Sequence, residues 1–487
     1  MPYTTDPFFC RLRAREFARL DALGQTYLDY TGGALYPESL VSRHAETLRG
    51  GVFGNPHSDS PASRASTARV EEARAAVLRH FRADPAEYEV CFTANASGAL
   101  RLVGEAFPFR PGARLLLAAD NHNSVNGLRE FARRAGADVR HLPLDGELRL
   151  LGAAEALDEP PASAPGLFAL PAQSNFSGVR HPAGLAAAAR ERGWRVLLDA
   201  AAAAPSGGLR LGEGGPDFAC VSFYKMFGYP TGVGALLARR DALAELRRPW
   251  FAGGTVEFVS TRHGTHLLRR GAEGFEDGTL DFLGIAAVPD GLEWLAGVGA
   301  ERLAAHLGGL TAALLDGLRA LRHPGGAPAV RIHGPATTES RGATVAFNLL
   351  DPAGRAVDHE RVEARARRAG ISVRGGCFCN PGAAEHAFGF PAEATRGFLE
   401  RAAADGFSIP AFRAHLGGAA VGAVRVSLGP ANVAEDVRRF LAFLDETRDE
   451  VAAEHAASPP ADPHGRHGSN GGSGRAPGWR RGRASAP

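Results

Sequence analysis

The sequence contains a single lysine, and this residue type points to covalent chemistry with an aldehyde. Lys225 lies in the stretch "SFYKMFGYPTG" and is the only lysine among 55 lysine and arginine residues. Arginine can replace lysine on a surface, but it cannot lose its proton at any useful pH. A lysine amine whose pKa is lowered by burial or a nearby cation can form a Schiff base. Because the apolar run "FACVSF" precedes it, we predict a Schiff-base lysine; the alternative is a leftover surface lysine.

Other polar residues supply what a pyridoxal phosphate (PLP) cofactor needs beside such a lysine. Asp199 ends an apolar run and could keep the pyridine nitrogen protonated, so that the ring withdraws electrons. The stretch "TANASG" (93–98) precedes a helix and, with the hydroxyl of Ser222, could hold a phosphate. His122 could stack on the ring or move protons. Taken singly, these residues could also be a turn cap, a helix cap and a structural histidine.

A second reactive centre lies in the loop "RGGCFCNPGAAEH" (374–386). Cys377 and Cys379 are one residue apart, and the positive charge of Arg374 favours the thiolate, which is the form that attacks. A metal site with His386 would need a fourth ligand at zinc-like spacing, which we do not find, so we predict no metal. Two interpretations of the cysteines remain: one of them is a nucleophilic or sulfur-carrying thiol, or both are plain structural residues.

The elements that position these residues form an alternating pattern. Apolar runs typical of buried strands are 88–94, 114–120, 166–173, 195–201 and 218–225. Helical stretches separate several of them, which predicts an open α/β sheet that binds its ligand at the carboxyl ends of the strands. Those ends carry Thr93 to Ser97, His122, Gln173 to Asn175, Asp199, and Ser222 to Lys225. We therefore expect these side chains on one rim.

The pattern changes near residue 290, where long Ala/Leu/Arg helices begin (roughly 300–322 and 355–369). The strands "GATVAFNLL" and "AVRVSLG" accompany them, which predicts a second, smaller α+β domain. We predict an N-terminal segment completing the small domain (1–50), a large PLP-binding domain (51–290), a small domain with the cysteine loop (291–450) and a disordered tail (451–487).

Composition narrows the function classes. The net charge is +2, and the stretch from Ala456 onward holds five arginines and one aspartate, so the rest of the chain is slightly acidic. That balance speaks against nucleic acid as a partner. Five cysteines are an odd number in a long chain and do not suggest a disulfide framework. Because the N-terminus lacks an apolar leader and no run could span a membrane, we expect a cytoplasmic protein without membrane contact.

Nine motifs, in order from residue 27 to 429, resemble one family. They are "YLDYTGGALYP", "GNPHS", "FTANASGAL", "PAQSNFSGVR", "LLDAA", "SFYKMFGYPTGVGALL", "FEDGT", "RGGCFCNPGA" and "VRVSLG". Together they resemble the N-terminal, cysteine-desulfurase-like domain of molybdenum cofactor sulfurases, in the class V group of PLP-dependent aminotransferases. The resemblance implies a PLP-dependent transferase of fold type I. Its large domain would hold a mostly parallel seven-stranded sheet between helices, with a smaller α+β C-terminal domain.

The resemblance also assigns roles at the cofactor. Lys225 would carry the aldehyde, Asp199 would pair with the pyridine nitrogen, and His122 would stack on the ring and handle protons. The phosphate would be held by Ala96, Ser97, Ser222 and Tyr224. Two departures lie at the site. Ala202 replaces the glutamine that simpler desulfurases place three residues after the aspartate, so another group must meet the ring oxygen. Ala384 stands where the sulfurase loop commonly has a third cysteine.

Substrate and partner roles follow in the same way. Asn175 would lie near the ring hydroxyl and the substrate carboxylate, which Arg425 would grip. Cys379 would take the sulfur. Thr255 matches a loop that reaches the cofactor phosphate of a partner subunit, which implies a homodimer. The resemblance covers the N-terminal domain of the sulfurases, and we expect no counterpart of their C-terminal molybdenum-cofactor-binding domain.

These expectations converge on a PLP-dependent cysteine desulfurase. It would move sulfur from L-cysteine to Cys379 as a persulfide, release L-alanine and deliver the sulfur to molybdenum cofactor or an acceptor protein. One alternative is a class V aminotransferase, lyase or epimerase acting on another amino acid, which would not need Cys379. The other is a sulfur relay protein without PLP chemistry.

Overall fold

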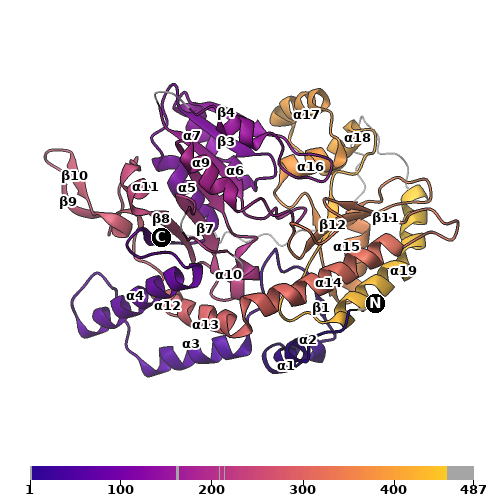
Figure 1. Cartoon of the computed structure of the whole chain (residues 1–487), viewed down its shortest axis with the longest axis horizontal. Helices are drawn as coiled ribbons and strands as arrows, with labels where there is room; N and C mark the ends of the chain where they lie inside the picture. The colour runs from indigo at the N-terminus through magenta and orange to yellow at the C-terminus, as the bar shows by residue number, and fades with distance from the viewer. Residues whose placement is uncertain (1–2, 161–163, 208, 213, 458–487) are drawn as a thin grey trace, which may run out of the picture. The chain divides into compact units, whose positions relative to one another are not determined.

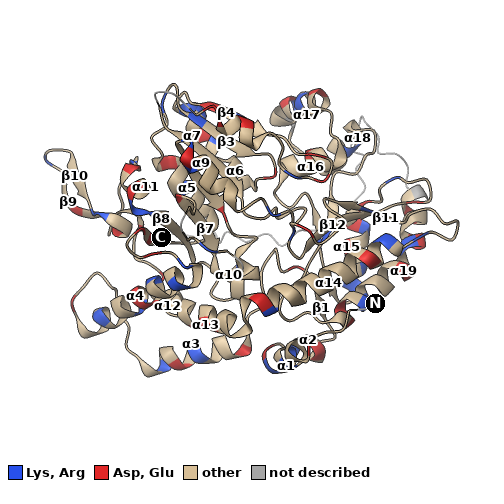
Figure 2. Ribbon diagram, viewed as in Figure 1, with Lys and Arg blue, Asp and Glu red and all other residues tan. Residues whose placement is uncertain are grey.

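The computed structural model describes residues 3–160, 164–207, 209–212 and 214–457 (Figure 1). The described residues up to Phe390, together with those from Ala420 onward, form one compact unit, and residues 391–419 form another. Within the described part of the chain, no helix is both long and apolar enough to cross a membrane. Basic and acidic residues are interspersed on helices such as α4 (Pro61–Phe81) and α15 (His359–Arg368) (Figure 2).

The first unit is built on a seven-stranded mixed sheet, which confirms the predicted fold class. In sheet order its strands are β2 (Tyr88–Thr93), β8 (Gly234–Arg239), β7 (Phe218–Ser222), β6 (Trp194–Asp199), β5 (Gly166–Pro171), β3 (Arg114–Ala118) and β4 (Asp138–Leu142). The pairs from β7 to β4 are parallel, and β8 is antiparallel to both of its neighbours. The sheet therefore brings the carboxyl ends of its parallel strands to one edge.

Helices cover both faces of this sheet because the central strands are apolar on both sides. In β3, Leu115 and Leu117 enter a core with residues of α5 (Ala96–Ala106) and α7 (Leu128–Arg134). Leu116 enters the opposite core, which includes residues of α4 and α9 (Gly184–Glu191). Shorter or peripheral helices are α3 (Glu38–Gly50), α6 (Asn123–Asn126), α8 (Ala153–Leu157), α11 (Arg240–Glu245), α12 (Phe282–Ile285) and α13 (Val288–Val298).

Two local predictions differ from the structure. The strand predicted over 218–225 ends at Ser222, and Phe223–Phe227 form the short helix α10, so Lys225 lies on a helical turn. The aromatic residues Phe223 and Phe227 are fully buried, which explains why the sequence continued to look like a buried strand. Strands β4 and β8 were not predicted; β4 lies at the sheet edge with three exposed residues, so it lacks a clear apolar pattern.

A four-stranded antiparallel sheet forms the other part of this unit. Its order is β11 (Val330–His333), β12 (Thr344–Leu349), β15 (Ala423–Ser427) and β14 (Arg374–Gly376). The long helices are α14 (Ala300–Ala320), α15 and α19 (Ala434–Ala457). A short parallel pair joins β1 (Thr26–Tyr27) to β13 (Ile371–Ser372). The domain boundaries at residues 50 and 290 stay predictions. Residues 451–457 belong to α19 rather than to the predicted tail, whose remainder lies outside the described residues.

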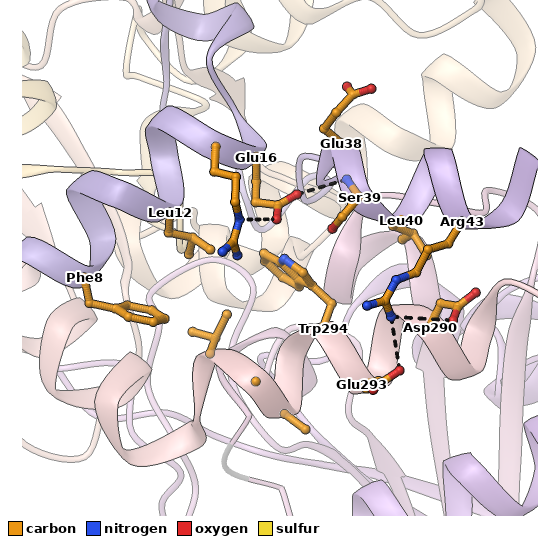
Figure 3. Close-up of a pocket in the computed structure, with 14 residues that line it drawn as sticks. Phe8, Leu12, Glu16, Glu38, Ser39, Leu40, Arg43, Asp290, Glu293 and Trp294 are labelled. Atoms are coloured by element: carbon orange, nitrogen blue, oxygen red, sulfur yellow. Dashed lines mark hydrogen bonds and ion pairs between the residues drawn. The ribbon is translucent and has the colours of Figure 1, made fainter. Parts of the chain in front are cut away.

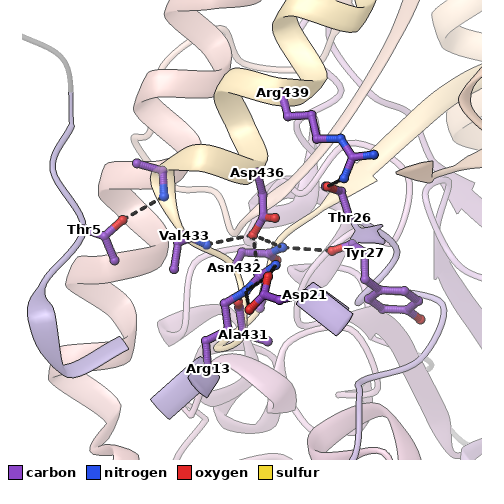
Figure 4. A network of polar contacts seen from close by, with 12 residues as sticks. Thr5, Arg13, Asp21, Thr26, Tyr27, Ala431, Asn432, Val433, Asp436 and Arg439 are labelled. Carbon is purple, nitrogen blue, oxygen red and sulfur yellow. Dashed lines mark hydrogen bonds and ion pairs between the residues drawn. The ribbon is translucent and has the colours of Figure 1, made fainter. Parts of the chain in front are cut away.

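A buried polar network fastens the N-terminal helices α1 (Pro7–Glu16) and α2 (Arg19–Ala22) to the start of α19 (Figure 4). Arg13 donates to Asp21 and to the buried carboxylate of Asp436, at 2.8 Å in each case. Asp436 also accepts from the backbone N–H of Val433, and Asn432 donates to the carbonyl of Tyr27. The network therefore joins segments that are more than 400 residues apart in the sequence.

The second unit is small and helical. It contains α17 (Ala392–Asp405) and α18 (Ile409–His415), and Phe398 packs against Phe407 and Phe412. Leu399 and Phe407 remain exposed on it.

Candidate active site

A cavity of about 210 Å³ lies at the carboxyl ends of the parallel strands. Its lining includes Asn95, Ala96, Ser97, His122, Ser124, Gln173, Asn175, Asp199, Ala202, Ser222, Tyr224 and Lys225. The polar residues that the sequence places at separate strand ends thus meet around one space, as the strand order predicts.

Lys225 lines this cavity, and the pKa of its amine is lowered. Burial lowers the pKa of its amine, and the positive charges of Arg425 and Arg374 act in the same direction. The carboxylate of Asp199 opposes them. The amine is therefore closer to its neutral, nucleophilic form than a surface lysine would be.

Asp199 and His122 complete the reactive part of the wall. Asp199 ends β6, and its Oδ1 accepts the backbone N–H of Ala201 at 3.0 Å. Burial lowers the pKa of His122, while the negative charge of Asp199 partly counteracts that effect. The Nδ1 of His122 accepts the backbone N–H of Ser124 at 3.1 Å, so neutral His122 carries its proton on Nε2.

The start of α5 forms a small polar cradle at the cavity. Asn95 caps the helix by accepting the N–H of Gly98 at 2.9 Å, and the N–H of Ala96 donates to the hydroxyl of Ser222 at 2.8 Å. A Cβ on Gly234 in β8 would lie 2.6 Å from the backbone of Asn95, so only glycine lets the strand approach this turn. Small residues, hydroxyls and a helix N-terminus suit a phosphate group. This donor set, beside Lys225, fits pyridoxal phosphate.

The cysteine loop is hydrogen-bonded to the same rim through its backbone. The side chain of Asn175 donates to the carbonyl of Phe378 at 2.7 Å and accepts from Asn380 at 2.9 Å. The carbonyl of Cys379 accepts the N–H of Asn123 at 2.7 Å. Phe378 and Cys379 both have positive φ angles, 57° and 55°, which non-glycine residues rarely adopt. The loop is thus held in a strained form.

The thiols themselves are outside the cavity. Cys377 and Cys379 are both exposed, and Cys379 does not line the cavity in this structure. His386 faces other groups: its Nδ1 donates to the carbonyl of Gly382, and its Nε2 accepts the N–H of Leu144. Among the described residues, no cluster of three or more His, Cys, Asp or Glu side chains could hold a metal.

Two further predicted residues lie apart from the cavity wall. Arg425 is buried in β15 and touches the rim indirectly, because its Nη1 donates to the carbonyl of Asn175 at 3.0 Å. Burial lowers its pKa, and Asp29 opposes the shift. Thr255 precedes β9 (Val256–Ser260), and its hydroxyl is bonded to the backbone of Ala252. The structure does not bring Thr255 to the cavity of its own chain.

Sequence reasoning missed three residues that shape the site. Ser124 bonds both His122 and Ser97, at 3.1 and 2.6 Å. The other two are Asn380 and Asp29. Asn380 stands one residue before a proline, which is a typical capping position. No comparable local signal singles out Asp29, because its partners are more than 300 residues away in the sequence.

A larger cavity, of about 820 Å³, contains none of the predicted site residues. It lies among α1, α3 and α13, with Phe8, Leu12 and Trp294 on its apolar wall (Figure 3). Arg43 pairs with Glu293 at its margin. Because its wall lacks the lysine and strand-end groups, we assign the chemistry to the smaller cavity.

Comparison with known proteins matches most of the chain to one family. The class-V aminotransferase family matches residues 26–440. Molybdenum cofactor sulfurases from Bos taurus and Arabidopsis thaliana are 37% and 35% identical over 90% and 89% of the chain. The chain spans about half the length of these curated relatives, 51% and 57%.

The fold is similar to that of solved cysteine desulfurases. One from Thermococcus onnurineus has a TM-score of 0.75 at 24% identity and covers 92% of this chain and 99% of its own. One from Escherichia coli has a TM-score of 0.70 at 22% identity, with 92% and 98% covered. At this level of identity the likeness concerns the fold.

Proposed function

The chain belongs to the class-V aminotransferase family, and from this membership we propose that it is a PLP-dependent cysteine desulfurase. Its substrate is L-cysteine, its products are L-alanine and a persulfide on Cys379, and the sulfur then passes to an acceptor. The relatives named molybdenum cofactor sulfurase favour molybdenum cofactor, free or held by another protein, as that acceptor.

The residues around the cavity have the right chemistry for the cofactor. Lys225 would hold its aldehyde, Asp199 its pyridine nitrogen and His122 the face of its ring. Its phosphate would be held by Ala96, Ser97, Ser222 and Tyr224, at the start of α5 and of α10. Bound pyridoxal phosphate supplies an electron sink that stabilises negative charge next to the substrate amine.

The side chains of the chain do the remaining work. Arg425 binds the substrate carboxylate through its guanidinium. Lys225, with its lowered pKa, takes and returns protons at Nζ, and neutral His122 can donate from Nε2. Asn175 keeps the cysteine loop beside the substrate, because it bonds the loop and accepts from Arg425 through its carbonyl.

Sulfur transfer is a displacement at sulfur. The Cys379 thiolate attacks the sulfur of L-cysteine, so that an S–S bond forms while the substrate C–S bond breaks. The electron pair left on the β-carbon takes a proton from Lys225 or His122, which gives L-alanine. The balance is one thiol plus L-cysteine going to one persulfide plus L-alanine. Cys377, also exposed, is available to assist or protect Cys379.

One observation carries the proposal: the loop with the two exposed thiols is bonded to the rim that holds the lysine. The purified protein should therefore be yellow with pyridoxal phosphate and form alanine and sulfide from L-cysteine and a reductant. Cys379→Ala should abolish both products while the colour remains. Unchanged turnover in that variant would favour an aminotransferase, lyase or epimerase, and failure to take up the cofactor would favour a sulfur relay.

A homodimer and a cytoplasmic location belong to the same proposal. The hairpin of β9 and β10 (Thr265–Leu268) exposes Phe258 and Leu267, each at 61%, and a protruding apolar hairpin suits contact with a second copy. Thr255 stands at the base of this hairpin. All five cysteines are free, which suits a reducing compartment.

A further inference from the structure

Asp29 connects two arginines, Arg374 and Arg425, whose charges act on Lys225. Its carboxylate accepts from Arg425 Nη2 at 2.9 Å and from Arg374 Nη2 and Nε at 2.7 and 2.9 Å. Arg374 and Arg425 are direct cross-strand partners in β14 and β15. Two like charges facing each other across strands repel, so the shared carboxylate is what allows them to stay together.

The cluster of Asp29, Arg374 and Arg425 is closely packed and largely buried. The side chains of Arg425 and Asp29 are only 3% and 11% exposed, whereas that of Arg374 is 49% exposed. A Cβ on Gly32 would clash with both Asp29 and Arg374, so the backbone of the "DYTGG" turn must approach the ion pair closely. The two guanidinium groups and one carboxylate leave one surplus positive charge, which suits an incoming carboxylate.

One donor atom of the Arg425 side chain has no hydrogen-bond partner. Its Nη1 and Nη2 donate to Asn175 and Asp29, but its Nε is buried and has no hydrogen-bond partner. Leaving a buried donor unpaired is costly, so such a group calls for a partner. The guanidinium is further fixed by the ring of Phe378, whose centroid lies 4.7 Å away.

We propose that Asp29 is a positioning residue with two linked tasks. It holds the guanidinium of Arg425 in the orientation that binds the substrate carboxylate, and through Arg374 it fastens the strand that leads into the cysteine loop. Carboxylate binding and thiol position thereby depend on one side chain. The first task rests on the proposed function; the second is a property of the fold and can be tested without catalysis.

The loop task is tested by deuterium labelling of the backbone that leads into the cysteine loop. The amides of strand β14 pair with β15 and exchange when that pairing opens. We expect Asp29→Asn, which keeps the size but removes the charge, to raise the labelling rate of the peptide that contains residues 374–376 about tenfold, since strand β14 then opens more often. The readout is the mass of that peptide over time, without substrate.

The carboxylate task is tested by steady-state kinetics of the cofactor-loaded enzyme. Asp29→Asn should raise the KM for L-cysteine about tenfold or more and change kcat less, because it weakens binding of substrate and transition state alike. Asp436→Asn is the matched control: it removes the charge of another buried aspartate that pairs with an arginine, Arg13, in the network of Figure 4, and neither residue lines the cavity. It should leave the KM and the labelling rate unchanged.

Each outcome decides a part of the proposal. The loop task would be overturned if Asp29→Asn is labelled at the wild-type rate, or if the labelling rate rises equally in both aspartate variants. A fall in kcat at constant KM would overturn the carboxylate task. If the wild-type enzyme does not convert L-cysteine, the carboxylate task is rejected together with the proposed function. The comparison of labelling rates still decides the loop task in that case.

Discussion

At the scale of single residues, the site is defined by groups whose pKa values are shifted from those in water. The amine of Lys225 and the imidazole of His122 both have pKa values lowered by burial, and Asp199 moderates both shifts. A general base needs a pKa near the working pH, and these shifts move the lysine toward that range. The arginine-rich remainder of the chain could not supply such a group.

The protonation of His122 predicts a specific pH profile. Its imidazole is neutral unless the pH falls below its shifted pKa, which lies under the usual value of 6.5. Because the Nε2–H is present in both the neutral and the protonated form, His122 should give kcat for L-cysteine no acid limb, whereas His122→Asn should lower kcat roughly 10²-fold or more. An acid limb in the wild type that disappears in the variant would make His122 a base and contradict its assignment as a proton donor.

At the scale of elements, much of the site follows from strand order. The apolar runs before His122, Asn175, Asp199 and Lys225 could be recognised from the sequence, because buried parallel strands are almost continuously apolar. The cysteine loop could be predicted as reactive but not placed, since its anchors, Asn175 and Asn123, are some 200 residues away or more. Contacts of that kind leave no periodic signal.

The close approach of β8 to the cradle gives a test of the cofactor site. Gly234→Ala should weaken pyridoxal phosphate binding about tenfold or more, because the added Cβ displaces the backbone of Asn95 at the start of α5. Gly146→Ala is the control, since a Cβ there meets nothing within 4 Å. Titration of the visible cofactor band measures both; equal affinities would argue against the cradle.

The hairpin of β9 and β10 gives a second test at this scale. Phe258→Asp should convert a dimer into monomers, because it places a charge in the apolar contact. Leu151→Asp, a similarly drastic change at an exposed leucine outside the hairpin, should leave the molar mass unchanged. Light scattering after gel filtration distinguishes the two; a dimeric Phe258→Asp protein would place the interface elsewhere.

At the scale of the whole molecule, segments from both ends of the sequence build one unit. N-terminal residues pack with α14 and with the start of α19. His306 in α14 lies at this junction: it stacks on Phe9 with ring centroids 3.6 Å apart and bonds Tyr3 and the carbonyl of Asn432.

Burial lowers the pKa of His306 to about 4, which predicts an acid-sensitive fold. The unfolded imidazole binds a proton below its usual 6.5, whereas the folded one does so only near 4. Stability is therefore complete above pH 6.5 and falls as the pH drops toward 4, by up to about 3 kcal/mol. Thermal unfolding of His306→Gln should show less of this loss; the exposed His263→Gln should behave as wild type.

The most direct test of the account is to locate the cofactor by mass spectrometry. The protein is loaded with pyridoxal phosphate, reduced with borohydride and digested, and the peptides are searched for a phosphopyridoxyl group. The account predicts one modified side chain, Lys225, and loss of both the label and alanine formation in Lys225→Arg, which keeps the charge but cannot form a Schiff base. A protein that stays unlabelled, or a Lys225→Arg variant that still converts L-cysteine, would contradict it.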